Sequence, residues 1–220
     1  MRTIELKKTV TFSNDKDADA LRDNLNEKGT LMINIMSSPG SGKTTLVSRL
    51  IKDMKDKVNI AVLEADIDSD VDAVKIEKLG AKAIQAHTDG MCHMDAGMTQ
   101  TALKEMGTDN IDLILLENVG NLICPAEFDT GSQLNLMILS VPEGDDKPLK
   151  YPLMFQKSDI LVISKTDTVS FFNFDFEKCN QRVKRLNKDI KIYPVSAKNG
   201  EGMDQLEEEI LNKLKQIKKS

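Results

Sequence analysis

Short apolar runs recur along the chain, and amphipathic polar stretches separate them. Several runs are almost continuously apolar, which is typical of parallel strands covered on both faces. The stretches between them repeat apolar residues at helical spacing. This alternation predicts an α/β fold of three layers, in which helices flank both faces of a mainly parallel sheet. The predicted strands are 31–36, 58–63, 82–86, 111–116, 133–141, 159–163 and 191–195.

Helices are predicted where apolar residues share one face and a glycine or a capping residue marks an end. Residues 1–12 are predicted to form a short strand or an arm, and Asn14 or Ser13 to cap the helix that follows. We interpret 1–30 as a strand and helix extension of one domain spanning 1–220. A polar turn is expected at 142–148. The predicted helices are 14–28, 46–54, one ending at Leu79, 95–106, 152–157, 174–188 and 203–217.

The segment SSPGSGKTT at 37–45 lies between a buried strand and an amphipathic helix. This order indicates a P-loop, because small residues let backbone N–H groups surround phosphate at a helix N-terminus. Lys43 would reach the terminal phosphates, and Thr44 would offer a hydroxyl to Mg²⁺. Ser37 replaces the first glycine of the usual motif, so an ordinary Gly-rich turn is the alternative. The predicted phosphate-binding residues are Pro39, Gly40, Ser41, Gly42, Lys43, Thr44 and Thr45.

Acidic residues follow two of the predicted strands. Five carboxylates lie within residues 64–72, and Glu117 ends another strand, with Gly120 three residues later. Glu117 resembles a Walker B acid, and Gly120 would let its backbone N–H approach the terminal phosphate. Asp68 and Asp70 are interpreted as capping or solvated residues. The predicted Mg²⁺ ligands are Thr44, Asp66, Asp72 and Glu117. The predicted catalytic residues are Lys43, Thr44, Asp66, Glu117 and Gly120, without an obvious hydrolytic base.

Two loops near the C-terminus predict guanine specificity. SKTD at 164–167 follows one strand and SAK at 196–198 follows the last. An aspartate accepts hydrogen bonds from both N1–H and N2–H₂ of guanine, whereas adenine lacks the second donor. The stem of Lys165 would cover the base, and the SAK backbone would contact O6. The predicted base-binding residues are Lys165, Asp167, Ser196, Ala197 and Lys198. A small-molecule kinase is an alternative that this pair of loops disfavours.

A thiol, an imidazole and a second thiol lie on loops at the same end of the predicted sheet. Cys92 and His93 are adjacent before a helix, and Cys124 follows the Glu117 loop. These ligand types suit Zn²⁺ or Ni²⁺. A fourth ligand is missing, and a symmetric dimer would supply one. The alternative is a structural Cys-His pair. Four further sulfur residues are interpreted as packing rather than as ligands: Met91, Met94, Met98 and Cys179.

Composition excludes several other functions. The net charge of −5 and the pI of about 5.2 disfavour a general nucleic-acid binder, which usually has a basic face. No apolar run approaches the ~20 residues that a membrane span needs. The first residues lack the apolar core of a signal peptide, and three cysteines do not make a disulfide framework. We therefore expect a cytoplasmic protein.

Five motifs together resemble the HypB family, the nickel-insertion GTPases of nickel–iron hydrogenase maturation: SSPGSGKT, GMCHMDAGM, ENVGNLICPAEFD, EGDDKPLKYPLMF and SKTD. The resemblance covers roughly residues 30–200. It implies Mg²⁺-dependent GTP hydrolysis, a homodimer favoured by GTP, and a Zn²⁺ or Ni²⁺ site at the dimer interface formed by Cys92, His93 and Cys124. It also implies a partner nickel metallochaperone and delivery to the hydrogenase large subunit.

Two alternatives to this interpretation remain. The urease-maturation GTPases share the nucleotide motifs but typically carry Cys-Pro-His at the metal loop and Glu-Ser-Gly-Gly after the strand. A metal storage or sensing protein with a vestigial nucleotide site is the other, although Lys43, Thr44 and Asp167 are intact. The chain also departs from some HypB members. It shows no cysteine-rich or histidine-rich nickel segment, Gly97 stands where some have a second histidine, and Ala65 replaces the usual glycine.

Overall fold

One seven-stranded sheet organises the molecule. The computed structural model describes residues 6–66, 76, 78–88 and 90–219. The strand order is β3-β2-β4-β1-β5-β6-β7, and all six pairings are parallel. The predicted α/β class and parallel sheet are therefore confirmed. The strands are β1 (Leu31–Ser37), β2 (Ile60–Asp66), β3 (Lys82–His87), β4 (Leu113–Glu117), β5 (Leu134–Ser140), β6 (Ile160–Ser164) and β7 (Lys191–Pro194).

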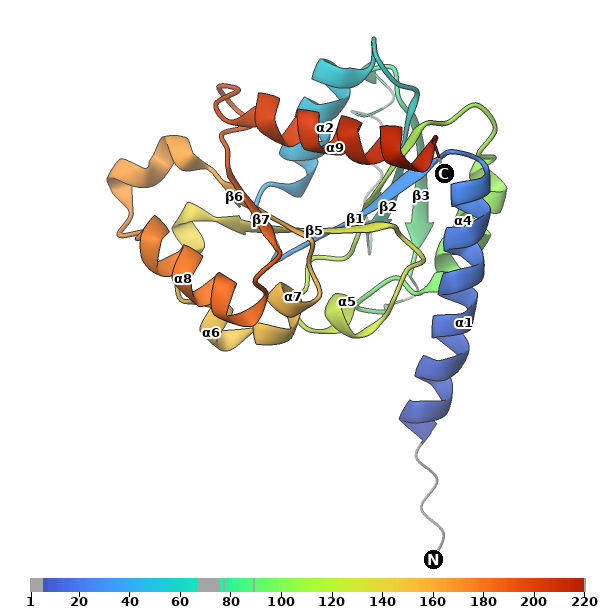
Figure 1. Cartoon of the computed structure of the whole chain (residues 1–220), viewed down its shortest axis with the longest axis horizontal. Coiled ribbons are helices and arrows are strands. Elements are labelled where there is room, and N and C mark those ends of the chain that lie inside the picture. Colours follow the sequence, from blue (N-terminus) through green and yellow to red (C-terminus); the bar gives the residue numbers. More distant parts are fainter. Residues whose placement is uncertain (1–5, 67–75, 77, 89, 220) are drawn as a thin grey trace, which may run out of the picture.

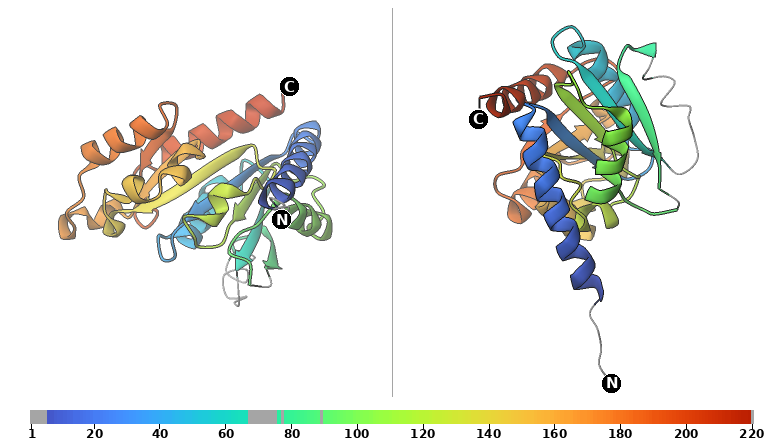
Figure 2. Two further views of the ribbon diagram at one scale, coloured as in Figure 1. Left: turned by 90° about the horizontal axis from the view of Figure 1, so that it is seen from below. Right: turned by 90° about the vertical axis from the view of Figure 1, so that its right-hand side faces the viewer.

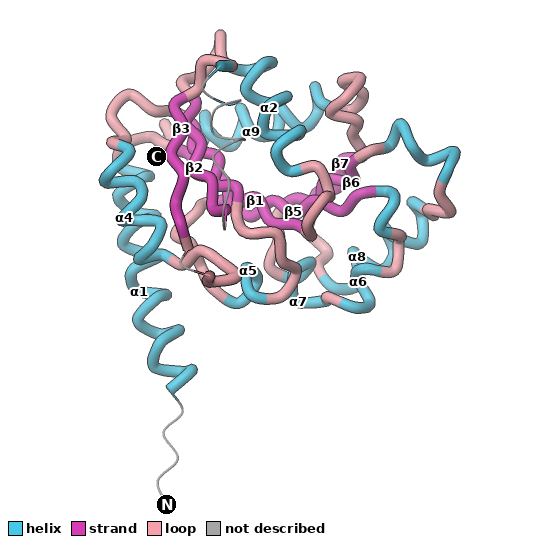
Figure 3. The backbone as a smooth tube through the Cα atoms, turned by 180° about the vertical axis from the view of Figure 1, so that it is seen from behind, coloured by secondary structure: helices cyan, strands magenta, loops and turns pink. Residues whose placement is uncertain are grey.

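Helices cover both faces of the sheet (Figures 1 and 3). α2 (Lys43–Met54) and α9 (Met203–Ile217) lie on one face. The helices that pack on the other face include α1 (Leu6–Glu27), α4 (Ala96–Met106), α7 (Pro152–Gln156) and α8 (Phe176–Leu186). The polar turn predicted at 142–148 is confirmed only in part: 145–146 form a turn, whereas the residues at either end belong to two short helical segments. The short segments are α5 (Cys124–Glu127), η1 (Val141–Glu143), α6 (Lys147–Lys150) and η2 (Thr166–Phe171).

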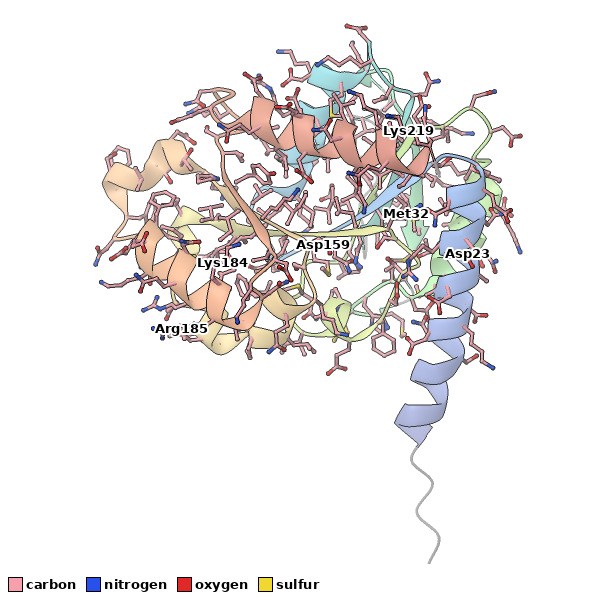
Figure 4. All side chains as sticks on the ribbon, in the orientation of Figure 1. Asp23, Met32, Asp159, Lys184, Arg185 and Lys219 are labelled. Carbon is pink, nitrogen blue, oxygen red and sulfur yellow. The ribbon has the colours of Figure 1, made fainter. Side chains whose placement is uncertain are left out.

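Alternate residues of β1 show how the sheet separates the hydrophobic core into one layer on each of its faces. Leu31, Ile33 and Ile35 pack against α2 and α9, whereas Met32 and Met36 face the opposite layer. This follows from the two-residue period of a strand. Figure 4 shows Met32 in the interior and Asp23 of α1 at the surface. Burial of each large apolar side chain contributes about 1.5–3 kcal/mol relative to its exposure.

The N-terminal helix is longer than the sequence predicts. The strand or arm predicted for 1–12 is wrong for the described part, since α1 begins at Leu6. Helix propagation adds one hydrogen bond for each residue that it fixes, so the helix extends from its packed part despite weak local propensity. Asn14 and Ser13 therefore lie inside α1 and are not its N-cap. Figure 2 shows the C-terminal end of α1 beside the C-terminal end of α9.

All seven strands end at one edge of the sheet, because they are parallel. Ligands of open α/β sheets bind at this edge. The helix predicted to end at Leu79 lies mostly outside the described residues, although Ile76 and Lys78 are helical. Cys179 is completely buried on α8, as its packing role predicts. Within the described part of the chain, no helix combines the length and apolar character needed to span a bilayer.

Candidate functional site

The P-loop connects buried β1 to the first turn of α2. Gly42 precedes this helix with φ of 104°, in a left-handed conformation that costs little only for glycine. Lys43 donates from Nζ to Ser37 Oγ at 3.0 Å, and Ser37 is completely buried. The serine in the place of the first motif glycine is therefore a contact of the motif lysine. Pro39 and Gly40 are exposed, as is Thr45 in the first helical turn.

A hydroxyl and a carboxylate meet beside this loop. Thr44 Oγ1 donates to Glu117 Oε1 at 3.0 Å, across from α2 to the end of β4. Both are hard oxygen donors and fit Mg²⁺. Asp66 is the last residue of β2, but its side chain is not described, and Asp72 lies outside the described residues. Glu64, for which the sequence suggested no role, is buried next to Glu117 in the β2–β4 register.

Gly120 brings the loop after β4 against the P-loop. A β-carbon placed on Gly120 would lie 3.2 Å from both N and Cγ of Pro39. Few real β-carbons approach a neighbour so closely, so a larger residue would displace the loop. The glycine predicted to approach the terminal phosphate thus contacts the P-loop directly.

The two loops predicted to bind guanine contact each other and the P-loop. Ser196 Oγ donates to Asp167 Oδ1 at 2.7 Å, which orients the carboxylate. Lys165 donates from Nζ to the carbonyl oxygen of Gly40 at 2.7 Å, so its stem lies along the P-loop. Ser164, the first residue of SKTD, was not predicted to be a site residue, and it donates to the carbonyl oxygen of Ser41 at 2.8 Å. Ala197 and Lys198 follow in the adjoining turn.

Cys92, His93 and Cys124 form a compact group. Their candidate ligand atoms all lie within 4.8 Å of one another. The first two lie just before α4, and Cys124 begins the short helix α5. His93 is buried, and within the described residues its Nε2 has no hydrogen-bond partner. Two thiols beside a buried imidazole fit Zn²⁺ or Ni²⁺.

The surroundings act differently on the imidazole and on the Cys124 thiol: they favour the metal-binding form of His93 and disfavour that of Cys124. Burial lowers the pKa of His93, although the carboxylates of Asp95 and Glu127 oppose this effect, so the imidazole is neutral at pH 7. A hydrogen bond with Cys92 raises the pKa of Cys124, and burial acts in the same direction. Phe128, which the sequence also did not single out, stacks on the His93 ring with centroids 3.9 Å apart.

Comparison with known proteins decides the family. The sequence profile of the CobW/HypB/UreG nucleotide-binding domain matches residues 31–194. The hydrogenase maturation factor HypB of Escherichia coli is 42% identical over 204 residues, which are 93% of this chain and 70% of the relative. The probable HypB of Methanocaldococcus jannaschii is 38% identical over 98% of this chain and 97% of its own length. The chain belongs to the HypB family.

A solved HypB structure agrees with this assignment. The crystal structure of HypB from Helicobacter pylori in complex with nickel matches with a TM-score of 0.87 and 38% identity, over 93% of this chain and 96% of that one. The chain is thus a nucleotide-binding P-loop protein of the HypB hydrogenase maturation factors, and its Cys-His-Cys group is compatible with metal binding. The resemblance predicted over roughly 30–200 is confirmed.

Proposed function

We propose that the chain is a GTP hydrolase that binds nickel or zinc and couples GTP hydrolysis to nickel delivery during nickel–iron hydrogenase maturation. One observation carries the coupling. The loop from Glu117 to Cys124 contains the acid that contacts Thr44, the glycine against the P-loop and a candidate metal ligand. A nucleotide-dependent movement of this loop would therefore change the metal group. Loops that become ordered or disordered with the bound nucleotide are common in nucleotide switches.

The proposed nucleotide chemistry rests mainly on positioning. Backbone N–H groups of 39–45 would hold the phosphates, and Lys43 would exchange its contact with Ser37 for the terminal phosphates. Mg²⁺, held by Thr44 and Glu117 with Asp66 and Asp72, would neutralise phosphate charge. Gly120 would offer its N–H to the terminal phosphate. Guanine would be bound by Lys165, Asp167, Ser196, Ala197 and Lys198, with Asp167 held by Ser196.

The proposed metal cargo would be bound by Cys92, His93 and Cys124. These three donors leave a tetrahedral site one ligand short, so we propose that a second copy of the chain completes it in a homodimer favoured by GTP. A nickel metallochaperone and the hydrogenase large subunit are the proposed partners, and the cytoplasm the proposed location. Reciprocal linkage requires that metal binding also change nucleotide affinity.

Delivery to a urease is a second candidate. Relatives from Helicobacter hepaticus and Helicobacter pylori, 38% and 36% identical to this chain, are named hydrogenase/urease maturation factor HypB. Nickel transfer to purified hydrogenase and urease apoenzymes would separate the two destinations.

The nucleotide assignment is tested with Lys43→Ala. Hydrolysis of GTP is expected to fall roughly 100-fold or more, because a preorganised charge at the phosphates is lost, while Ni²⁺ binding persists. Lys52→Ala is the matched control, since Lys52 is an exposed lysine of the same helix. Phosphate release is measured with GTP and with ATP. Wild-type turnover in Lys43→Ala, or equal use of ATP, would contradict the proposal.

A further inference from the structure

Three hydrogen-bonded asparagines link the loop after β4 to β1 and β5, and two of them are buried. Asn34 of β1 donates from Nδ2 to Asn135 Oδ1 at 3.0 Å. Asn118, in the loop after β4, donates from Nδ2 to Asn34 Oδ1, also at 3.0 Å. Asn118 is 0% exposed and Asn34 is 2% exposed. Burying an amide is costly unless it is hydrogen-bonded, so these contacts hold Asn118 in one orientation.

Asn118 joins the nucleotide loop to the metal loop. Its Oδ1 accepts from the backbone N–H of Met94 at 3.1 Å and from that of Val119 at 2.8 Å. Its own backbone N–H donates to the carbonyl oxygen of Ile35 at 3.0 Å. Met94 directly follows His93, whereas Asn118 directly follows Glu117. A single buried side chain therefore fixes the backbone of both loops.

Asn14 of α1 holds the other side of the metal loop. Its Oδ1 accepts from the backbone N–H of Ala96 at 2.9 Å, and its Nδ2 donates to the carbonyl oxygen of Asp129 at 2.9 Å. Asn14 is 8% exposed, so its burial resembles that of Asn118. Neither of these two side-chain contacts involves the nucleotide loop. The two asparagines thus make similar contacts to the metal loop and differ in their second partner.

We infer that Asn118 is the positioning residue that couples nucleotide state to metal affinity. This inference rests on the proposed function. When the Glu117–Gly120 segment shifts between GTP and GDP, Asn118 shifts with it, since its side chain bonds to its own loop. The hydrogen bond to Met94 then displaces the backbone beside Cys92 and His93. Coupling between sites can be carried by packed side chains and hydrogen-bond networks, and this buried contact provides such a connection.

The test measures Ni²⁺ affinity in two nucleotide states. Full-length wild type, Asn118→Ala and Asn14→Ala are titrated with Ni²⁺ in the presence of GDP or a non-hydrolysable GTP analogue. In wild type the two affinities are expected to differ by about fivefold or more, as for typical allosteric pairs. Asn118→Ala is expected to bind Ni²⁺ with the same affinity in both states. Asn14→Ala is expected to bind more weakly in both while keeping the wild-type ratio.

The outcomes separate this inference from the proposed function. A wild-type ratio of one overturns the proposed coupling, and the inference with it. A wild-type ratio preserved in Asn118→Ala overturns the inference alone. A ratio lost equally in Asn14→Ala also overturns it, because general loosening of the metal loop would then suffice. If Asn118→Ala does not fold, Asn34→Ala decides. It removes the acceptor of Asn118 Nδ2 and the donor to Asn135, and leaves the contacts of Asn118 Oδ1 in place. The ratio is expected to fall by roughly twofold, and an unchanged ratio overturns the inference.

Discussion

At Gly120 even a methyl group would crowd the neighbouring backbone. The neighbour of an added β-carbon would be the P-loop itself, at Pro39. We predict that Gly120→Ala weakens GTP binding by roughly tenfold, or about 1.4 kcal/mol, because the loop must move to relieve the contact. Equilibrium binding of a fluorescent GTP analogue measures the effect.

Gly97→Ala provides the control for this substitution. Its added β-carbon would meet only Asp95 Oδ1, at an ordinary contact distance of 3.5 Å, in the first turn of α4. GTP affinity is expected to remain at the wild-type value. If Gly120→Ala also binds GTP normally, the approach of this loop to the P-loop does not matter for the nucleotide.

The three cysteines differ enough to test the metal site one residue at a time. We predict that Cys92→Ala weakens Zn²⁺ or Ni²⁺ binding by more than the roughly 10- to 100-fold cost of losing an outer-shell partner. Cys179→Ala is the control and is expected to keep wild-type affinity, since this thiol projects from α8 into the hydrophobic core. Competition with a chromophoric chelator measures both. Equal affinity and stoichiometry in Cys92→Ala and wild type would remove Cys92 as a ligand.

Some contacts at the residue scale could not be predicted from the sequence. Motif spacing identified Lys43, Glu117 and Asp167, because their chemistry depends on nearby residues in the chain. The hydrogen bond between Asn34 and Asn118 joins residues 84 positions apart. The sequence around an asparagine in a strand does not indicate which distant residue it bonds to. The stacking of Phe128 on His93 likewise depends on how the two loops meet.

At the scale of elements, a strong hydrophobic pattern predicted the positions of helices and strands well. The helix predicted at 203–217 is confirmed as α9, and each predicted strand overlaps a strand of the sheet. Continuous apolar runs have one stable place in such a fold, between two helical layers. The start of α1 was missed because tertiary packing of its later residues extends it over weak helix formers. The helix α5 was missed because four residues carry no periodicity.

The contact between α9 and α2 contains a buried carboxylate with one oxygen that lacks a hydrogen bond in the described part of the chain. Glu207 is 6% exposed, and within the described residues its Oε1 has no hydrogen-bond partner. Burial raises the pKa of Glu207, and the neighbouring carboxylate of Asp53 adds to the effect. Asp53 itself pairs with Arg49 on α2. The ionised form of Glu207 therefore destabilises the folded chain.

We predict that Glu207→Gln stabilises the protein by about 1 kcal/mol at pH 7, the order of cost of an unsatisfied buried group. The raised pKa means that wild type loses stability as pH rises from the unfolded value, near 4, through the folded one. The gain should therefore shrink as pH falls toward 4. Urea denaturation at both pH values measures it. Glu208→Gln, at the exposed neighbouring position, should have little effect; a gain in Glu207→Gln that is independent of pH would contradict this account.

At the scale of the molecule, parallel strands gather every candidate site at one edge. The loops after β1, β4, β6 and β7 contribute to the nucleotide group, and those after β3 and β4 to the metal group. The fold could be predicted because this arrangement follows from strand direction alone. How many copies of the chain share the edge is a property of surfaces and not of periodicity.

We predict that the GTP analogue together with Ni²⁺ doubles the molar mass from 24.5 kDa, while GDP without metal leaves it unchanged. The reason is that one chain offers three candidate ligands, and a symmetric partner would supply the rest. Light scattering coupled to gel filtration measures the mass in each state. In Cys124→Ala, Ni²⁺ should no longer increase the measured molar mass. A single mass in all states would contradict the proposed dimer.

The burial of Cys179 also provides an internal reference for chemical labelling. Burial raises the pKa of its thiol to about 12, whereas Cys92 and Cys124 are both partly exposed. Thiolate is the form that an alkylating reagent attacks, so Cys179 stays unlabelled while the chain is folded. The mass gained by the unmodified protein in iodoacetamide would then report on Cys92 and Cys124 only. Protection from that gain measures metal occupancy in a cell extract, without any substitution in the chain.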